Sequence, residues 1–334
     1  MIAPERPGQH RDVAGSEATA ARRQPSPGIV SIAPSQPHEF VEAVIAGGAV
    51  VEPISDRTTG LVWLSEKRAP ELSEILSANP QIEWVQLPWA GVDGFRDLFA
   101  ALDHDNAPVF TSAKGSYAQP VAEHALALIL SLARELPRKA REAVWQTDRT
   151  GLSLFGNHVV IVGAGGITRE FIRLVAPFAP RITVVRKQDE PLEGAHRTVG
   201  VDSLREVLID ADVLLIAAAA TTETTHLIGA DEIAALPDHA IIVNVARGEI
   251  LDTNAVLNAL KQDALWGVGL DVTEPEPLPA DSELWNQPRC VITSHSADTP
   301  LMTKFLLAER IRTNVANLMS GKPLIGVVDT RSGY

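Results

Sequence analysis

The sequence predicts an α/β protein with two doubly wound domains, each a parallel sheet covered by helices. Three observations support this. Short apolar runs of strand length alternate with helical patterns, and the alternation restarts at about residue 158. The chain of 334 residues also exceeds what one hydrophobic core usually organises.

In the first half, the expected strands are 29–32, 49–51, 61–64, 84–87 and 109–110, with helices over 40–45 and 70–77. A long helix is expected over 120–136, where the pattern is apolar on most faces, and Pro137 ends or kinks it. A second helix containing Trp145 should follow.

The second half continues the alternation to a final helix. The expected strands are 158–162, 182–185, 213–217, 240–245, 267–270 and 290–293, and helices are expected over 168–177, near Leu204, Asp231 and Asn254, and over 303–319.

Composition limits the partners. A net charge of −13 repels polyanions, so we expect neither nucleic acid nor an anionic membrane as a partner. No apolar run is long enough to span a bilayer. Residues 1–27 lack the apolar core of a secretory signal and are expected to be a disordered tail, which makes a cytoplasmic location the default. The one cysteine, Cys290, excludes a thiolate-rich metal site; an inert thiol is favoured over a reactive one.

A glycine turn follows the strand that starts the second half. Gly163 allows the tight turn, and Gly165 lets a pyrophosphate approach the backbone at a helix N-terminus, which includes Gly166 and Ile167. Thr168 replaces the third glycine of this fingerprint, which should loosen a helix–strand contact. We therefore expect a dinucleotide site; the alternative is a turn without a ligand.

The end of the next strand indicates which nucleotide binds. NAD-selective sites place a carboxylate there, but this chain has Arg186 and Lys187, which suit a 2′-phosphate. NADP(H) is therefore the preferred cofactor and NAD(H) remains possible, while the alternative is a solvated basic turn.

Three polar residues follow three consecutive strands of the second half. Arg247 offers a planar cation for a carboxylate and carbonyl, and His295 is a proton donor near neutral pH. Glu276 is placed to stabilise the imidazolium. Singly, each fits a surface or structural role; together at strand ends, where ligands of open α/β sheets bind, they predict reduction of a 2-keto acid.

Seven ordered segments carry a resemblance to a known family: WVQLPWAGVD, VAEHALALIL, VVIVGAGGI, TTETTHLIG, NVARGEILD, GLDVTEPEPLP and ITSH. With these, the chain resembles the D-isomer-specific 2-hydroxyacid dehydrogenases, in particular glyoxylate/hydroxypyruvate reductases, from about residue 80 to its end. The likeness implies a Rossmann nucleotide-binding domain (118–299) inserted into a flavodoxin-like substrate-binding domain (28–117 and 300–334). It also implies a homodimer, for which the helix 120–136 and Trp145 would be suited.

The resemblance also assigns roles. It implies that Arg247 binds the substrate carboxylate and carbonyl, that Glu276 pairs with the imidazole, and that His295 is the acid/base. Asp271 falls where the family contacts the nicotinamide carboxamide. A backbone loop would hold the substrate carboxylate through the amides of Ala90, Gly91 and Val92.

Two departures from the family pattern flank the histidine. Ser294 replaces the usual proline, and Asp298 replaces a small or amide residue, adding a carboxylate that would act on His295 or compete for Arg247. Trp89 beside the carboxylate loop either narrows the substrate pocket or packs the domain.

The sequence thus predicts a D-specific reductase of a small 2-keto acid, or dehydrogenase of the 2-hydroxy acid, with no metal. One alternative is a catalytically weak protein that senses nucleotide on the same fold. Another is a formate-type dehydrogenase, which would leave the glutamate–histidine pair with less to do.

Overall fold

The computed structural model describes residue 10 and residues 24–331. The chain divides into two compact units. Unit 1 comprises the chain up to Tyr117 and again from Thr299, and unit 2 is Ala118–Asp298. The two units are described separately below.

The expected disordered tail, 1–27, lies largely outside the described residues. Over 24–27, which are described, the expectation is wrong. The Gln24 side chain donates to Lys322 O at 2.8 Å, and Pro25 is buried. Residues 24–27 therefore begin the ordered part of unit 1 that the structure describes, contrary to what their polar composition suggested.

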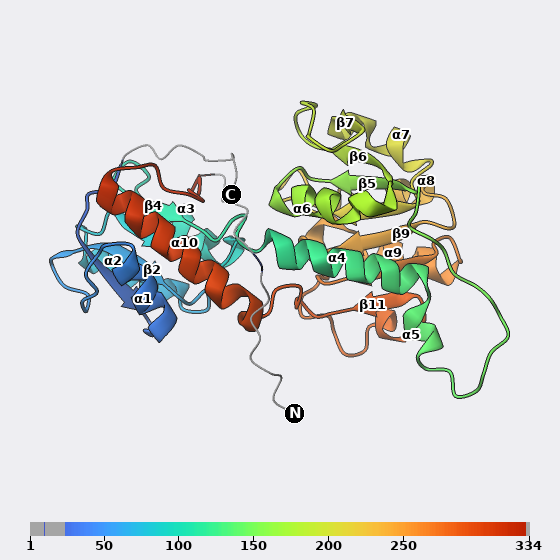
Figure 1. Ribbon diagram of the computed structural model, residues 1–334, viewed down its shortest axis with the longest axis horizontal. Coiled ribbons are helices and arrows are strands. Elements are labelled where there is room, and N and C mark those ends of the chain that lie inside the picture. Colours follow the sequence, from blue (N-terminus) through green and yellow to red (C-terminus); the bar gives the residue numbers. More distant parts are fainter. Residues whose placement is uncertain (1–9, 11–23, 332–334) are drawn as a thin grey trace. The chain divides into compact units, whose positions relative to one another are not determined.

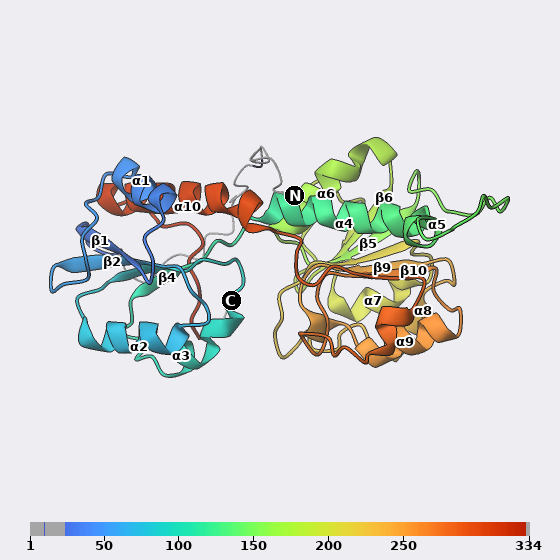
Figure 2. The ribbon, with the colours of Figure 1, turned by 90° about the horizontal axis from the view of Figure 1, so that it is seen from below.

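Unit 1 has a four-stranded parallel sheet with helices on both faces (Figures 1 and 2). Helices α1 and α10 cover one face and α2 and α3 the other. The elements are β1 (Ile29–Ala33), α1 (His38–Ala46), β2 (Thr58–Trp63), α2 (Ala69–Ala78), β3 (Trp84–Gln86), η1 (Asp93–Phe95), α3 (Arg96–Ala100), β4 (Val109–Thr111) and α10 (Pro300–Ser320).

The strand order β1-β2-β3-β4 becomes flavodoxin-like when one further contact is included. Val51 forms a single parallel bridge with Val30, which pairs with β2 along its other edge. The expected strand over 49–51 is therefore wrong: it is reduced to this one bridge, because Pro53 lacks the amide that would continue the ladder.

Unit 2 has a seven-stranded, wholly parallel sheet in the order β11-β10-β9-β8-β5-β6-β7. Its elements are α4 (Ala118–Ala133), α5 (Leu136–Lys139), β5 (His158–Val162), α6 (Gly166–Val175), η2 (Ala176–Phe178), β6 (Arg181–Val185), β7 (Arg197–Val199), η3 (Val201–Ser203), α7 (Leu204–Leu208), β8 (Val213–Ile216), α8 (Ala230–Ala235), β9 (Ile241–Asn244), η4 (Gly248–Ile250), α9 (Thr253–Lys261), β10 (Gly267–Leu270), η5 (Glu283–Asn286) and β11 (Cys290–Ile292).

This order is that of the Rossmann fold, with the topological switch between β5 and β8. All five residues of β5 are buried, as expected for a central parallel strand covered on both faces. The predicted fold class, two doubly wound parallel-sheet units, is confirmed.

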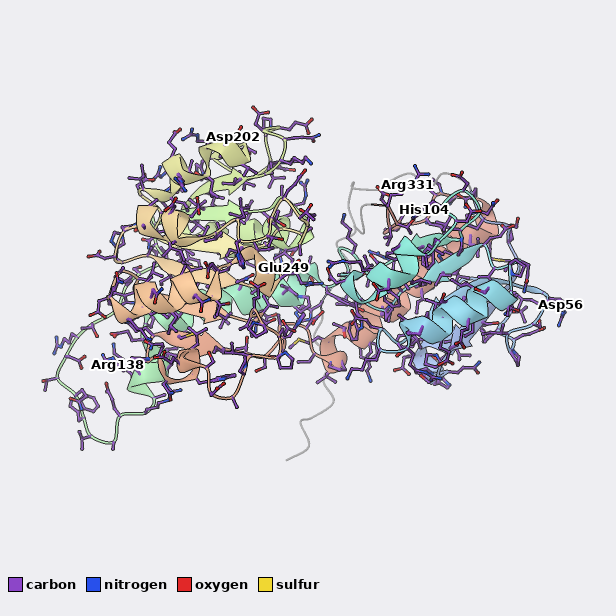
Figure 3. The ribbon with its side chains drawn as sticks, turned by 180° about the vertical axis from the view of Figure 1, so that it is seen from behind. Asp56, His104, Arg138, Asp202, Glu249 and Arg331 are labelled. Atoms are coloured by element: carbon purple, nitrogen blue, oxygen red, sulfur yellow. The ribbon has the colours of Figure 1, made fainter. Side chains whose placement is uncertain are left out.

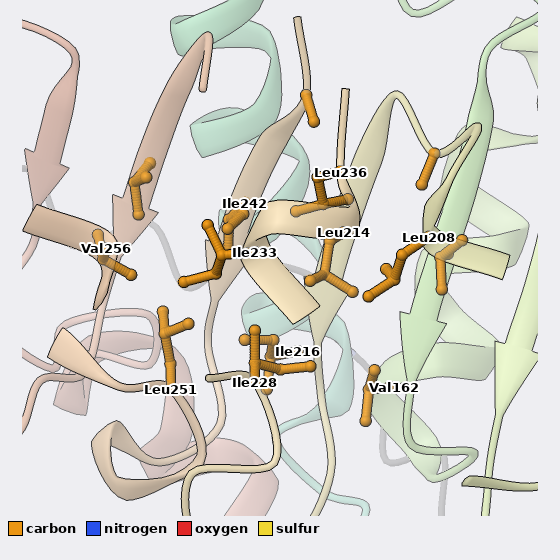
Figure 4. Close-up of a cluster of buried hydrophobic side chains, with 14 of the residues drawn as sticks. Val162, Leu208, Leu214, Ile216, Ile228, Ile233, Leu236, Ile242, Leu251 and Val256 are labelled. Atoms are coloured by element: carbon orange, nitrogen blue, oxygen red, sulfur yellow. The ribbon is translucent and has the colours of Figure 1, made fainter. Parts of the chain in front are cut away.

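A hydrophobic core of unit 2 lies between its sheet and α7, α8 and α9 (Figure 4). Leu214, Ile216 and Ile242 point from the strands toward Ile233 and Val256 of the helices. Helices α4 and α6 cover the opposite face (Figure 2). This packing fixes the positions of the strand ends, from which the site residues project.

The segment after α4 differs from the prediction. Helix α4 ends at Ala133, α5 has four residues, and the expected helix with Trp145 is absent. Trp145 is 95% exposed and Val144 70% exposed, so a helix there would have no buried face to stabilise it. Strand β7 was missed, because its sequence Arg-Thr-Val is not an apolar run.

Two further expectations concern single features. No helix in the described part of the chain is long and apolar enough to cross a membrane. Cys290 is an unpaired thiol, and burial raises its pKa to about 12. Thiolate is therefore scarce near neutral pH, in agreement with an inert cysteine.

Candidate active site

The glycine turn joins β5 to α6 at the switch point of the sheet. Gly163 has φ +107°, and a Cβ atom there would lie 2.5 Å from Ala217 O, so only glycine fits. Gly165 differs: a Cβ atom there would meet nothing within 4 Å. The first amides of α6, at Gly166 and Ile167, lack partners within the helix by its geometry, as the predicted phosphate-binding role requires.

Thr168 takes the place of the third glycine. Its side chain is fully buried, and its hydroxyl donates to Gly163 O at 2.8 Å. The expectation that this residue loosens the contact is therefore wrong, because the hydroxyl ties the first turn of the helix back to the glycine turn.

The basic pair follows β6. Lys187 is 80% exposed, and its ammonium pairs with Glu223 at 2.8 Å. Arg186 is half-buried, and its guanidinium makes no hydrogen bond or ion pair with any described residue. One cation is thus already paired within the protein, and the other is available to a ligand.

Arg247 is placed by a buried asparagine at the end of β9. The Asn244 amide donates to Arg247 O at 2.9 Å and accepts from Ala246 N at 3.0 Å. A Cβ atom on Gly248 would lie 1.9 Å from Thr273 O, so this glycine lets the loops after β9 and β10 pack together. Asn244 was missed in the sequence, where it reads only as the end of an apolar strand.

His295 follows β11 and pairs with a carboxylate from the loop after β10. Its Nδ1 lies 2.7 Å from Glu276 Oε1, and both side chains are slightly less than half exposed. Because a carboxylate accepts only, this contact places a proton on Nδ1 and leaves Nε2 to exchange a proton with a substrate.

The histidine sits on an unusual backbone turn. Ser294 and His295 have φ of +50° and +54°, a region that costs non-glycine residues about 1–3 kcal/mol each. Proline, the usual family residue at position 294, has φ fixed near −65° and cannot adopt this turn. Serine at this position is therefore compatible with the observed backbone where proline is not.

Asp271 holds this turn from the end of β10. The residue is 2% exposed, and its carboxylate accepts from Thr293 Oγ1 at 2.7 Å, Ser296 N at 2.8 Å and Ala297 N at 3.2 Å. Its backbone oxygen accepts from His295 N at 2.6 Å. Most of the hydrogen-bond acceptor sites of this carboxylate are thus occupied by donors within the protein.

Asp298 adds a second carboxyl group beside the histidine. Burial raises its pKa to about 6; the charge of His295 opposes this shift, that of Asp271 adds to it, and that of Arg247 opposes it. Asp298 therefore changes charge close to neutral pH within reach of two predicted catalytic groups.

A second histidine–glutamate pair went unnoticed in the sequence. His226, after β8, is hydrogen-bonded through Nε2 to Glu274, and this bond, with the charge of Glu274, raises the histidine pKa. Both residues lie in motifs that carry the family resemblance, but the motifs give no sign that the two side chains meet.

The predicted carboxylate loop belongs to unit 1. Its ends are fixed: Tyr117 OH donates to Pro88 O at 2.7 Å, and Ala113 N donates to Trp89 O at 2.9 Å. Trp89 is 39% exposed and makes an edge contact with the Tyr117 ring. Among the residues described, none accepts a hydrogen bond from the amides of 90–92, which leaves them for an anion.

Known proteins resemble this chain over both units. The model of the D-isomer specific 2-hydroxyacid dehydrogenase NAD binding domain matches residues 126–297. An uncharacterized protein from Corynebacterium melassecola is 31% identical over 307 residues, which cover 89% of this chain and 98% of that protein. A glyoxylate reductase from Korarchaeum cryptofilum is 30% identical over 294 residues, 84% of this chain and 85% of the relative.

A solved structure gives the same likeness. The NADPH-dependent glyoxylate/hydroxypyruvate reductase SmGhrA from Sinorhizobium meliloti, in complex with NADP and sulfate, aligns with a TM-score of 0.74 at 25% identity. The alignment covers 92% of this chain and all of that chain.

Proposed function

Because the chain belongs to the D-isomer specific 2-hydroxyacid dehydrogenase family, we propose that it reduces the C2 carbonyl of a small 2-keto acid to the D-hydroxy acid. The observation that carries this proposal is the Glu276–His295 pair, which joins the loops after β10 and β11, with Arg247 after β9, the next strand of the same sheet. A proton donor of this kind is what the oxygen of a reduced carbonyl requires.

NADP(H) is the proposed cofactor, and NAD(H) remains possible. Gly163 and Gly165 leave room for the pyrophosphate, and the amides of Gly166 and Ile167 would bind it. Arg186 would bind the 2′-phosphate, with Lys187 once it exchanges its partner Glu223 for the ligand. When bound, the nicotinamide supplies the hydride to C2. The NADPH-dependent S. meliloti reductase supports this preference.

Side chains of unit 2 would bind the substrate and transfer the proton. Arg247 would bind the substrate carboxylate and polarise the carbonyl. His295 would donate the Nε2 proton to the carbonyl oxygen as C2 receives the hydride, and Glu276 would stabilise the imidazolium. Asp271 would keep the histidine turn in place and, through the remaining capacity of Oδ2, contact the nicotinamide carboxamide.

The substrate is proposed to be glyoxylate, hydroxypyruvate or another small 2-keto acid. Glyoxylate is the substrate in the name of the K. cryptofilum relative, and both acids are named for the S. meliloti reductase. In unit 1, the amides of Ala90, Gly91 and Val92 suit the substrate carboxylate, since no described residue occupies them.

A homodimer formed through unit 2 is also proposed. The segment from 140 to 157 extends away from the body of this unit (Figure 1), with Trp145 95% exposed at its surface. Arg138, labelled in Figure 3, lies at the base of the segment and pairs with Glu135, Glu142 and Asp148. An exposed tryptophan on a segment held by ion pairs suits a partner copy. A cytoplasmic location remains a prediction.

The test is loss of reduced-nicotinamide absorbance with glyoxylate, hydroxypyruvate, pyruvate or phenylpyruvate, run separately with NADPH and NADH. We expect NADPH to be oxidised in the presence of at least one of these acids. A preference for NADH would retain the reductase and overturn the phosphate-binding role of Arg186 and Lys187. Absence of turnover, in protein shown to bind nucleotide, would favour a nucleotide sensor instead.

A further inference from the structure

The backbone turn that carries His295 makes several hydrogen bonds to one residue, Asp271. Three consecutive amides, those of His295, Ser296 and Ala297, all donate to Asp271, the first to its backbone oxygen and the others to its carboxylate. Two adjacent left-handed residues persist only where the surrounding contacts fix them. The position of Asp271 therefore sets the position of the imidazole.

Asp271 is itself connected to a helix that none of the proposed chemistry uses. The Thr293 hydroxyl donates to Asp271 Oδ1 at 2.7 Å, and His124 Nε2 lies 2.9 Å from the same hydroxyl and 3.5 Å from Asp271 Oδ1. His124 is on α4, and its side chain is 22% exposed. The His124 imidazole is thus mostly buried, next to the turn that carries His295.

The hydrogen count fixes the direction of these bonds. A threonine hydroxyl has one proton, and here it goes to the Asp271 carboxylate, which can only accept. His124 Nε2 must therefore be the donor to Thr293 Oγ1. A hydroxyl that accepts one hydrogen bond donates a stronger one, so the His124 N–H reinforces the Thr293–Asp271 contact.

We propose that His124 is a positioning residue for the catalytic imidazole, acting through Thr293 and Asp271 on the backbone turn of Ser294 and His295. The inference rests on the proposed function, because it assumes that His295 is the acid/base. The proposal gives a role in catalysis to His124, whose side chain contacts Thr293 and Asp271 but neither the His295 imidazole nor Glu276.

Two matched pairs of variants test the proposal. Gln places an N–H donor close to where His has Nε2, so His124→Gln keeps the bond, whereas His124→Met has similar length and no donor. Thr293→Ser keeps the hydroxyl, and Thr293→Val removes it at equal volume. We expect His124→Met and Thr293→Val each to lower kcat about tenfold, because small misplacements of a catalytic group are costly. KM and nucleotide affinity should stay within about twofold, and Gln and Ser should retain most of kcat.

The double variant His124→Met/Thr293→Val should lose no more than Thr293→Val alone, because both act through one chain of bonds. Hydrogen exchange of the 295–297 amides supplies a readout that does not depend on turnover. We expect faster exchange in His124→Met and wild-type exchange in His124→Gln. If the wild type turns over no 2-keto acid, the proposed function fails and exchange alone decides the positioning role. Wild-type kcat or exchange in His124→Met, or equal losses in Met and Gln, would overturn the proposal.

Discussion

The two halves of the carboxyl edge of the unit 2 sheet are built in opposite ways. Beyond β9, β10 and β11, polar side chains bond to one another and to nearby backbone, and Asp271 is 2% exposed. Beyond β5 and β6, the groups predicted to bind the nucleotide have few protein partners: the Arg186 guanidinium has none among the described residues, and Lys187, 80% exposed, pairs with Glu223. In the first half, hydrogen bonds within the protein fix the positions of the side chains. In the second half, the Arg186 guanidinium and the first amides of α6 are left for a ligand.

This difference matches what each half would do. A group that transfers a proton must be held in place before the substrate arrives, so its supporting bonds are made within the protein. Groups that bind phosphate contribute most to the free energy of binding when they have no hydrogen-bond partner in the free protein. Changes in the first half should therefore affect turnover, and changes in the second should affect nucleotide affinity.

The largest effect is expected from His295→Ala. Loss of the proton donor should lower kcat for 2-keto acid reduction about 10³-fold, while the dissociation constant of the nucleotide changes by less than about twofold. Steady-state kinetics and nucleotide titration by fluorescence measure the two quantities. If turnover and nucleotide affinity were both lost, the two halves of the edge would not be independent. Unaltered turnover would show that His295 is not the acid/base.

The two glycines of the β5 turn should separate folding from binding. Gly163→Ala should lower the free energy of unfolding by about 3 kcal/mol, because the added Cβ meets Ala217 O and φ is +107°. Gly165→Ala should leave stability nearly unchanged, since its Cβ enters open space, but weaken nucleotide binding about tenfold or more. Denaturant unfolding and nucleotide titration test both variants. Tight binding by Gly165→Ala would show that the pyrophosphate does not approach this backbone.

The smallest effect is expected from Asp298→Asn, and it depends on pH. Burial raises the pKa of this carboxyl to about 6 from 3.8, so the folded state favours the protonated form. The stabilising effect of that proton is present below about pH 4 and is lost as the pH rises through 6. The asparagine variant has no such loss, so its Tm should exceed the wild-type Tm by a few degrees at pH 7.5 and by less at pH 4.5. A Tm difference that is the same at both pH values would contradict this assignment.

Much of the fold and some of the site geometry follow from local sequence. The buried run of β5, the glycine turn and the long apolar helix α4 are each encoded by neighbouring residues, so periodicity and spacing suffice. The contact between Glu276 and His295 was expected for two reasons. Residues that follow neighbouring strands of a parallel sheet lie at the same edge of the sheet, and the family resemblance pairs these two residues. Their catalytic roles remain predictions.

The remainder depends on contacts that local sequence does not encode. His124 and Thr293 are 169 positions apart, and a histidine inside an apolar helix gives no sign of what it contacts. The helix expected at Trp145 fails for the converse reason, since its pattern required a buried face that the fold does not provide. Val51 retains one bridge because a proline two residues later ends the ladder.

The use of backbone amides to hold the histidine turn also bears on how such a site can evolve. The hydrogen bonds that hold the turn come from main-chain groups at 295–297 and from Asp271, not from the side chains at 294 and 298, although the residue at 294 must accept a positive φ. Those two positions are among those at which this chain departs from the family pattern. Selection can therefore change the chemical character of the site at both positions while the predicted acid/base, His295, keeps its position, so that new substrates can be accepted without a change in the residues proposed to carry the proton transfer.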